Sequence, residues 1–350
     1  MRVVGAFLIV MLTFAGACAS TPSAAGACAG RTIDAISYGS PHISLYQGEV
    51  IRVCDDGSHL QRLSAHEFES PLGIAVMSNG DRVITSGKSE SINQRLSIID
   101  SAGKLKVSKV LAYCPAGVAV NRDGMIIVGH KYGGAFEVDC RSTATLVSVY
   151  TSDLTEAFRF QAAPATNFTR LSNGDYLAYA YDYGPLFEIT HDFHTRALAD
   201  YRLIGSITDA DAKGTETVVS TIRRTRASEF VGFVKVFKNT GSALKIIKQV
   251  SNIPMLRSVA LSDDGSVFYS GNGRITKLNT TSGRSRVFRD HLIDPGKIAI
   301  SDSEIIVENH HRFFSGADLE VYDLKTGILK RTLLRNIALL GQIVVTQLNR

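Results

Sequence analysis

The sequence predicts an all-β fold, a seven-bladed β-propeller, and three observations lead to this prediction. A degenerate unit of about 45 residues recurs along the 350-residue chain, a period typical of propellers and solenoids. Each unit reads as four short apolar strands separated by turns, with no clear helical periodicity between them. The last apolar segment, 340–347, repeats the first-strand pattern of a unit but no further strand follows it.

The first strand of the unit is the clearest element. It is followed in most units by an Asn-Gly or Asp-Gly pair, which supplies the positive φ that a tight hairpin turn needs. The segments that show this strand best are 70–80, 114–124, 256–265 and 294–302.

The remaining three strands follow in a fixed order. A second apolar run comes after the turn, as in 83–85, 125–128, 176–179, 267–269 and 304–307. A third run follows a variable loop, and we expect it at 96–100, 135–139, 186–189, 233–237, 275–278 and 319–323. A Gly-bearing turn then leads to a more polar fourth strand, such as 328–333.

The two ends of the chain together predict the last blade. The N-terminal segments 43–46, 49–54 and 60–63 read as three strands without an innermost partner, and 340–347 reads as an innermost strand without successors. We therefore predict one propeller domain over 43–350, closed by a blade that combines both termini, which hides exposed sheet edges. If the degenerate unit around 204–237 is not a full blade, the ring has six blades.

The repeat resembles NHL-repeat, gluconolactonase-like and other lactonase-type propellers. The resemblance is carried by the Pro-Leu-Gly-Ile-Ala-Val run at 71–76 and the Pro-Ala-Gly-Val-Ala-Val run at 115–120, each followed by its Gly-containing turn. It covers about residues 43–350 and implies a superfold rather than a particular activity. The chain contains no Trp, which argues against the Trp-docked repeats of quinoprotein propellers.

The first residues are expected to direct export. Arg2 precedes an uncharged run over 3–17 that suits a signal-peptide core, so we assign 1–19 to a signal peptide and 20–42 to a flexible leader. The sequence around Cys18 also fits a lipoprotein signal, in which Cys18 would be acylated, and ordinary cleavage after Ala19 is the alternative. Both predict a periplasmic or secreted protein, attached to a membrane only through a lipid anchor, if at all.

Four further cysteines accompany the expected export: Cys28, Cys54, Cys114 and Cys140. Three disulfide pairings are open, as are free thiols. Cys28 lies on the predicted leader and reaches Cys54 most easily, whereas Cys114 and Cys140 are expected on opposite faces of the ring.

Overall composition narrows the partner classes. The formal net charge is +5 and the sequence pI is about 8.9, values that permit an anionic partner but do not by themselves indicate nucleic acid. No cofactor is expected, since no Cys-x-x-Cys-His motif for covalent haem is present.

The candidate ligand site is the rim that carries the loops between second and third strands. Because these loops and the links into the next blade surround the same channel entrance, their side chains are expected to converge. They are cationic and aromatic, and Arg, Lys and Tyr suit an oxyanion or a sugar-like ligand. The candidate residues are His130, Lys131, Tyr132, Asp182, Tyr183, Arg223, Arg224, Arg226, His310, His311 and Arg312.

The sequence signals for an enzyme or a metal site are weaker than those for the cationic rim. His310 and His311 would point to opposite faces of a strand, so no metal site is expected there. A gluconolactonase-like enzyme would need several carboxylates and an asparagine at the channel entrance to hold a divalent cation. Only Asn167 and Asp182 suit that role in the predicted entrance positions, and Lys297 opposes it.

The sequence thus predicts an exported binding or scaffold protein. It would capture an anionic small molecule, a glycan or a protein partner on its cationic, aromatic rim. A metal-dependent hydrolase or lactonase of the gluconolactonase-like type is the alternative, and the sequence leaves open whether the chain is an enzyme.

Overall fold

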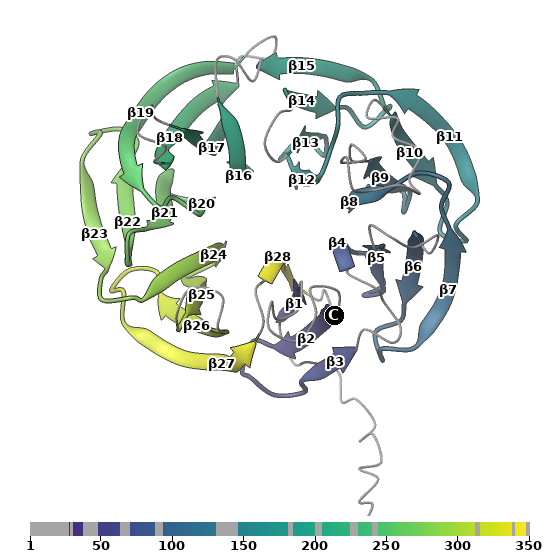
Figure 1. The fold of residues 1–350 in the computed structure, drawn as a ribbon, viewed down its shortest axis with the longest axis horizontal. Helices are drawn as coiled ribbons and strands as arrows, with labels where there is room; N and C mark the ends of the chain where they lie inside the picture. The colour runs from purple at the N-terminus through teal and green to yellow at the C-terminus, as the bar shows by residue number, and fades with distance from the viewer. Residues whose placement is uncertain are drawn as a thin grey trace, which may run out of the picture.

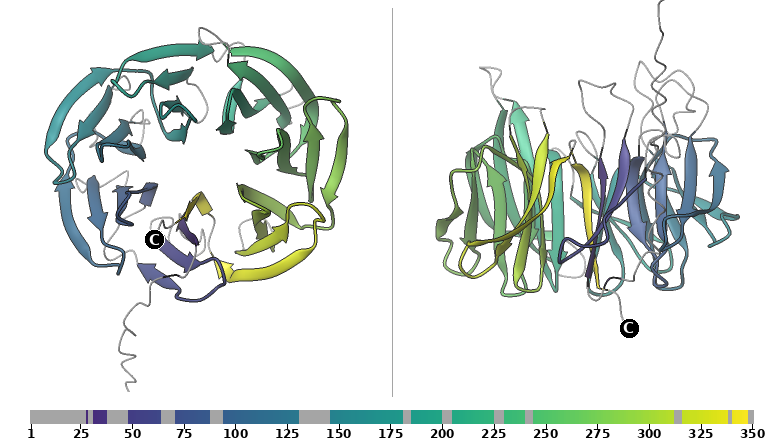
Figure 2. Two further views of the ribbon diagram at one scale, coloured as in Figure 1. Left: turned by 180° about the vertical axis from the view of Figure 1, so that it is seen from behind. Right: turned by 90° about the horizontal axis from the view of Figure 1, so that it is seen from below.

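The computed structural model describes residues 28, 31–37, 48–63, 71–87, 94–130, 146–180, 185–199, 205–224, 230–239, 244–311, 316–337 and 340–347. Over these residues the chain forms seven four-stranded antiparallel sheets and no helix. Figure 1 shows the sheets as blades arranged in a ring, with one strand of each nearest the centre and one along the outside, and Figure 2 shows the same ring from behind and from below. The predicted seven-bladed β-propeller is therefore confirmed.

Six blades are continuous in the chain, and each is given from its inner to its outer strand. Blade 1 is β4 (Pro71–Val76), β5 (Arg82–Ser86), β6 (Arg95–Ile99) and β7 (Leu105–Val110); blade 2 is β8 (Pro115–Val120), β9 (Ile126–His130), β10 (Leu146–Tyr150) and β11 (Glu156–Gln161); blade 3 is β12 (Asn167–Arg170), β13 (Tyr176–Tyr179), β14 (Leu186–Ile189) and β15 (Thr195–Ala199). Blade 4 is β16 (Ser206–Lys213), β17 (Glu216–Arg224), β18 (Phe230–Asn239) and β19 (Leu244–Pro254); blade 5 is β20 (Ser258–Leu261), β21 (Ser266–Gly271), β22 (Arg274–Asn279) and β23 (Ser285–Arg289); blade 6 is β24 (Asp294–Ser301), β25 (Glu304–His310), β26 (Ala317–Asp323) and β27 (Leu329–Ile337).

Blade 7 closes the ring with both ends of the chain. Its inner strand is β28 (Leu340–Gln347), followed outward by β1 (Arg31–Ser37), β2 (Glu49–Cys54) and β3 (Gln61–Leu63). β28 and β1 pair antiparallel along their whole length, from Arg31 opposite Gln347 onward. The predicted closure by three N-terminal strands and one C-terminal strand is confirmed.

The first of those strands was placed wrongly from the sequence. β1 lies at 31–37, inside the stretch predicted as a flexible leader, while 43–46 falls outside the described residues. The alternation in β1 explains the strand: Ile33 and Ala35 are buried in a core cluster with residues of blade 6. A segment that looks isolated in the sequence is thus ordered by its long-range partner, β28.

Two other blades also bear on the sequence predictions. The third strand of blade 2 is β10 at 146–150, whereas the predicted 135–139 segment lies outside the described residues. Blade 4 is complete, with four strands over 206–254, so the six-bladed alternative is wrong.

The hairpin turns behave as their sequences predict. Gly80, Gly124 and Gly265 follow Asn or Asp in the turns after the inner strands, and their φ values are 83°, 79° and 74°. A side chain in this left-handed region would be strained, so glycine is favoured at these positions.

Adjacent blades pack face to face through apolar side chains. Between blades 1 and 2, for example, Val83 and Leu96 on one sheet share a cluster with Val118 and Val128 on the next. Each blade therefore buries both of its faces, and the ring encloses its core between blades rather than in one central layer.

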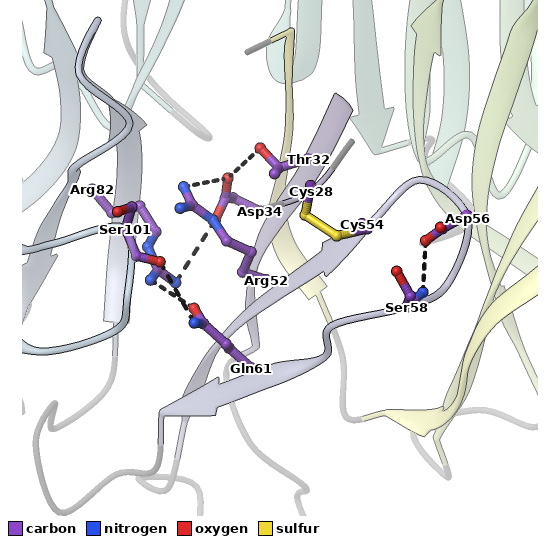
Figure 3. The surroundings of a disulfide bond; sticks show 10 residues. All are labelled: Cys28, Thr32, Asp34, Arg52, Cys54, Asp56, Ser58, Gln61, Arg82 and Ser101. Atoms are coloured by element: carbon purple, nitrogen blue, oxygen red, sulfur yellow. Dashed lines mark hydrogen bonds and ion pairs between the residues drawn. A yellow bond between two sulfur atoms is a disulfide. The ribbon is translucent and has the colours of Figure 1, made fainter. Parts of the chain in front are cut away.

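A disulfide fastens the start of the domain to blade 7. Cys28 is bonded to Cys54 at the end of β2, as Figure 3 shows, so one of the pairings left open by the sequence is settled. Cys114 is also disulfide-bonded. Cys18 and Cys140 lie outside the described residues.

Buried ion pairs join blade 7 to its two neighbours. Arg52 Nε donates to Asp34 Oδ1 at 2.7 Å within blade 7, and Arg82 of blade 1 lies 3.8 Å from the same oxygen (Figure 3). On the other side, Glu304 of blade 6 accepts hydrogen bonds from Arg31 at 2.8 Å and from Arg331 at 2.8 and 2.9 Å. The ring is therefore held closed by charge contacts as well as by strand pairing.

Candidate functional site

The site follows from the inner strands of the ring. A cavity of about 370 Å³ lies between the inner strands β12, β16, β20, β24 and β28, which Figure 1 shows around the centre. This volume is in the range of small-molecule sites. Its polar lining residues are Asn167, Thr169, Arg170, Tyr179, Asp209, Asp211, Lys297 and Gln342.

Backbone bulges aim the two central charged residues. In β16 the register shifts between Ile207 and Asp209, and in β24 it shifts between Pro295 and Ile298, on either side of Lys297. Such bulges re-aim side chains at the rims of barrels and at active sites. Here the bulges place Asp209 and Lys297 on the cavity wall, with Lys297 Nζ 3.2 Å from Asp209 Oδ1.

Asp209 of blade 4 is contacted by residues of three other blades. Its Oδ1 accepts a hydrogen bond from the hydroxyl of Tyr179 at 3.3 Å and forms the ion pair with Lys297, and its Oδ2 accepts from Val259 N at 3.3 Å and from the hydroxyl of Ser258. Burial and the nearby Asp209 charge raise the pKa of Tyr179 well above its usual value, so its hydroxyl remains a donor. Asp209 is thus a rigid anchor for Lys297.

Several other polar side chains in the ring connect adjacent inner strands, which cannot pair as a sheet. Each supplies a hydrogen bond that crosses from one blade to the next, and this satisfies backbone groups that would otherwise be unpaired. The pairs are Thr169 Oγ1 to Ala210 O at 3.0 Å, Leu261 N to Asp211 Oδ2 at 2.8 Å, Ile298 N to Ser258 Oγ at 3.2 Å and Ile74 N to Gln342 Oε1 at 3.1 Å.

Asp211 is the buried acid of this set. Burial raises its pKa to about 6, and the charge of Asp209 adds to this effect. Hydrogen bonds from the backbone N–H groups of Leu261 and Ala212 act in the opposite direction. Its carboxyl therefore titrates near neutral pH, two residues along the strand from the Asp209–Lys297 pair.

A second ionisable pair, Glu308 and His310 of β25, lies next to the backbone of Lys297. Glu308 accepts from Lys297 N at 2.9 Å, and its other oxygen lies 3.1 Å from His310 Nε2. Burial would lower the pKa of His310, but the hydrogen bond and charge of Glu308 outweigh it and raise the pKa. Gly296 allows this arrangement, because a Cβ there would lie 2.3 Å from Glu308 Oε2.

The predicted rim histidines have structural partners. His130 is 1% exposed, with Nδ1 3.3 Å from Cys114 O and Nε2 2.9 Å from Ser148 Oγ, and burial lowers its pKa to about 4. His310 contacts Glu308, whereas His311 contacts Asp318 at 2.9 Å. The two adjacent histidines therefore have different partners, as expected for side chains on opposite faces of a strand.

The two predicted rim arginines that fall on described residues lie at the end of β17, and Arg223 is not among the residues that line the cavity. Arg223 is exposed near the end of β17, and Arg224 ends that strand. The remaining predicted site residues, Lys131, Tyr132, Asp182, Tyr183, Arg226 and Arg312, lie outside the described residues.

Asn167 and Lys297, which bear on the metal alternative, both lie on the channel wall. Among the described residues no group of three or more His, Cys, Asp or Glu side chains is arranged to hold a metal ion. Asn167, which the sequence offered for that role, does line the cavity, and its Nδ2 donates to Thr166 Oγ1 at 3.0 Å. Lys297 is also on the wall, as predicted, and its positive charge is unfavourable for a cation.

Sequence reasoning missed Asp209 and Asp211. The signal that marks them is the alternation in Ser206-Ile-Thr-Asp-Ala-Asp-Ala212, which puts two carboxylates on one face of an innermost strand. Asp is rare in strands, so two at this spacing indicate a specific partner rather than a solvent face.

Comparisons with known proteins support the fold. No protein-family model and no curated protein matches the chain. A protein from Lactobacillus plantarum aligns with 91% of this chain and 99% of its own at 11% identity and a TM-score of 0.62. A functionally unknown protein from Desulfotomaculum acetoxidans aligns with 89% and 98% at 13% identity and a TM-score of 0.61.

A third similar structure is a catalytically inactive virginiamycin B lyase from Staphylococcus aureus, solved with quinupristin. It is 10% identical, with a TM-score of 0.54, and the alignment covers 79% of this chain and 92% of the lyase. At identities of 10–13%, the likeness to these three structures shows the β-propeller fold and no particular family.

Within the described residues no helix is long and apolar enough to cross a membrane.

Proposed function

We propose that this protein is an exported binding protein that captures a small polar ligand with an anionic group in the mouth of its central channel. The observation that carries the proposal is the cavity of about 370 Å³ whose wall holds Lys297 fixed by Asp209. A cation oriented in advance costs less ordering on binding than a mobile surface lysine.

The rest of the wall suits the polar part of such a ligand. Asn167 and Gln342 contribute amide groups, and Arg170, whose side chain is exposed, contributes a second cation. Apolar residues, including Val259 and Ile298, provide a surface for the ligand's carbon skeleton. A sugar acid or a phosphorylated sugar combines these chemical groups.

The rim residues are part of the same proposal. Arg223, Arg224, Arg226, Arg312 and Lys131 would surround the entrance and attract anions, while Tyr132 and Tyr183 would offer flat faces to a sugar ring. We infer export from the N-terminal signal and from the Cys28–Cys54 disulfide, since disulfides persist in oxidising compartments. In the lipid-anchored form of this proposal, Cys18 is acylated.

A thermal-shift screen tests the ligand class. The purified protein is screened against sugar acids, phosphorylated sugars, inorganic phosphate, lactones and divalent metals, and we expect stabilisation by the acidic compounds. Lys297→Gln should remove that shift, because it removes the charge but keeps a hydrogen-bond donor for Asp209. A shift with Ca²⁺ alone, with turnover of lactones, would instead favour the metal-dependent hydrolase.

Lys277→Gln is the matched control. Lys277 Nζ also lies 3.2 Å from an aspartate, Asp264, but it does not line the cavity. Equal loss of the shift in both variants would contradict the channel proposal. Export is tested separately by fractionating cells that express the full chain or its Cys18→Ser variant.

A further inference from the structure

A second surface lies on the same face of the ring as the channel mouth. Because the strands of each blade alternate in direction, the starts of third strands and the links between blades lie on one face. Three exposed apolar side chains occupy these places in blades 4 to 6: Phe230 (60% exposed), Met255 (41%) and Ile293 (60%). We call these three residues the apolar crescent.

The members of the crescent are neighbours. Phe230 precedes Val231, whose register partner on β19 is Pro254, next to Met255. Gly271 of the β21–β22 turn lies against Met255, since a Cβ there would be 3.1 Å from Met255 O. Gly273 of the same turn lies against the link before β24, because a Cβ on Gly273 would be 2.9 Å from Leu292 O. Met255 and Ile293 therefore flank one turn.

The crescent has a fixed backbone. Arg257 N donates to Ser270 O at 3.1 Å, and Leu292 N donates to Gly273 O at 2.9 Å, so both links are bonded to blade 5. Along this rim the non-glycine residues with positive φ are Asn252, Met255, Asn272 and His291, at 61°, 50°, 50° and 57°. Such conformations cost free energy and gather at functional sites. The apolar side chains are thus presented on a rigid surface.

The charges beside the crescent are mainly positive. Arg223, exposed on β17, pairs in register with Val231 beside Phe230, and Arg274 is exposed at the start of β22. Among the described residues neither guanidinium has a carboxylate within ion-pair distance. Of the nearby acids, Asp294 is paired with Arg257 at 3.2 Å. The side chain of Asp290 is 61% exposed and lies 3.5 Å from His291, which is charged only when protonated.

We propose that the apolar crescent is the docking surface for a protein partner, which presents a segment that combines apolar residues with Asp or Glu. The apolar side chains of the segment cover Phe230, Met255 and Ile293, and its carboxylates pair with Arg223 and Arg274. Contiguous exposed apolar groups with a polar border are typical of protein interaction sites. Arginine binds carboxylates through two parallel hydrogen bonds, which adds orientation to the contact.

A display selection tests this proposal. Random 12-residue peptides are selected on the immobilised full-length protein, and the affinity of each enriched peptide is measured by fluorescence polarisation. We expect enriched sequences to combine apolar with acidic residues. Their affinity should fall at least 10-fold in the variant with Phe230, Met255 and Ile293 changed to Ser, and at least fivefold in Arg223→Ser with Arg274→Ser.

The matched control changes three apolar residues on the opposite face. Leu60, Leu105 and Ile328 are 46%, 45% and 65% exposed near the starts of fourth strands, and their replacement by Ser should leave peptide affinity unchanged. All variants should keep the melting temperature of the parent, since the changed side chains are exposed.

Three results of the selection would overturn the proposal. They are the absence of enriched peptides, enriched peptides that lack acidic residues, and peptides that bind the crescent variant as tightly as the parent. Sedimentation of the protein alone tests the other possible occupant of the surface, a second copy of this chain. A dimer that the crescent variant cannot form would assign the surface to a second copy of this chain and would refute the acidic partner.

Discussion

Glu304 provides a quantitative test of ring closure, because it connects blade 6 with the N-terminal strand of blade 7. It is 4% exposed and accepts from Arg31, Arg331 and Lys330. The hydrogen bonds from Arg331, which outweigh burial, lower its pKa from 4.5 to about 2. We predict that Glu304→Gln destabilises the fold at pH 7, because the three cations lose their shared carboxylate.

The size of the effect follows from the pKa. At 1.36 kcal/mol for each pH unit, the difference between 4.5 and about 2 corresponds to about 3 kcal/mol. Lys330 and Arg331 keep 40% and 25% of their side chains exposed, so solvent screening reduces this to about 2 kcal/mol. Because the folded-state pKa is depressed, this stability is present above pH 4.5 and is lost as the pH falls through about 2.

Chemical denaturation at pH 7 and at several lower pH values provides the assay. The parent should lose about 2 kcal/mol more than Glu304→Gln as the pH falls from 5 to 2. Glu49→Gln is the control, since Glu49 forms a single 3.2 Å contact with Arg62, which is 41% exposed, and should cost less than about 1 kcal/mol. If Glu304→Gln were as stable as the parent at pH 7, the charge contribution to closure would be refuted.

Three further outcomes follow from the structure. Cys28→Ser should lower the free energy of unfolding by about 3 kcal/mol, because it opens the loop that the bond to Cys54 closes; reduction of the parent should lower it at least as much, since Cys114 is also disulfide-bonded, and an unchanged denaturation midpoint would contradict this. Burial raises the pKa of Asp211 to about 6, so the parent should lose stability as the pH rises from about 4 to about 6, because the unfolded state releases this proton while the folded state still holds it; denaturation of Asp211→Asn across that range should show a flatter profile, and an equally steep one would exclude Asp211 as the cause. Gly296→Ala should lower the melting temperature, because its Cβ would meet Glu308 Oε2 at 2.3 Å and His310 Nε2 at 2.6 Å, whereas a wild-type melting temperature would mean that the pair moves freely.

The sequence predicts the blades well because their determinants are local. The Asn79-Gly80 turn and the apolar run at 83–85 in β5 require no knowledge of distant residues, and both occur where expected. β1 was missed because Arg31–Ser37 lies in the sheet between β2 and β28, and β28 is more than 300 positions away in the sequence. Long-range pairing of this kind leaves little local signal beyond a short apolar alternation.

The candidate site was predictable only in part, for a similar reason. Lys297 and Asn167 were expected at the channel entrance from their places in the repeat, and both line the cavity. Asp209 was not expected, because its role depends on donors from three other blades and on a bulge in β16. His130 was expected on the rim, but β9 extends far enough to bury it against Ser148.

Isothermal titration of the best acidic hit tests the central claim of ligand capture at Lys297. The parent and Lys277→Gln should bind it with equal affinity, and Lys297→Gln should bind at least 10-fold more weakly, as expected when a charged hydrogen bond worth about 1.5–3 kcal/mol is lost. Equal binding by Lys297→Gln and the parent would show that the channel mouth is not the binding site.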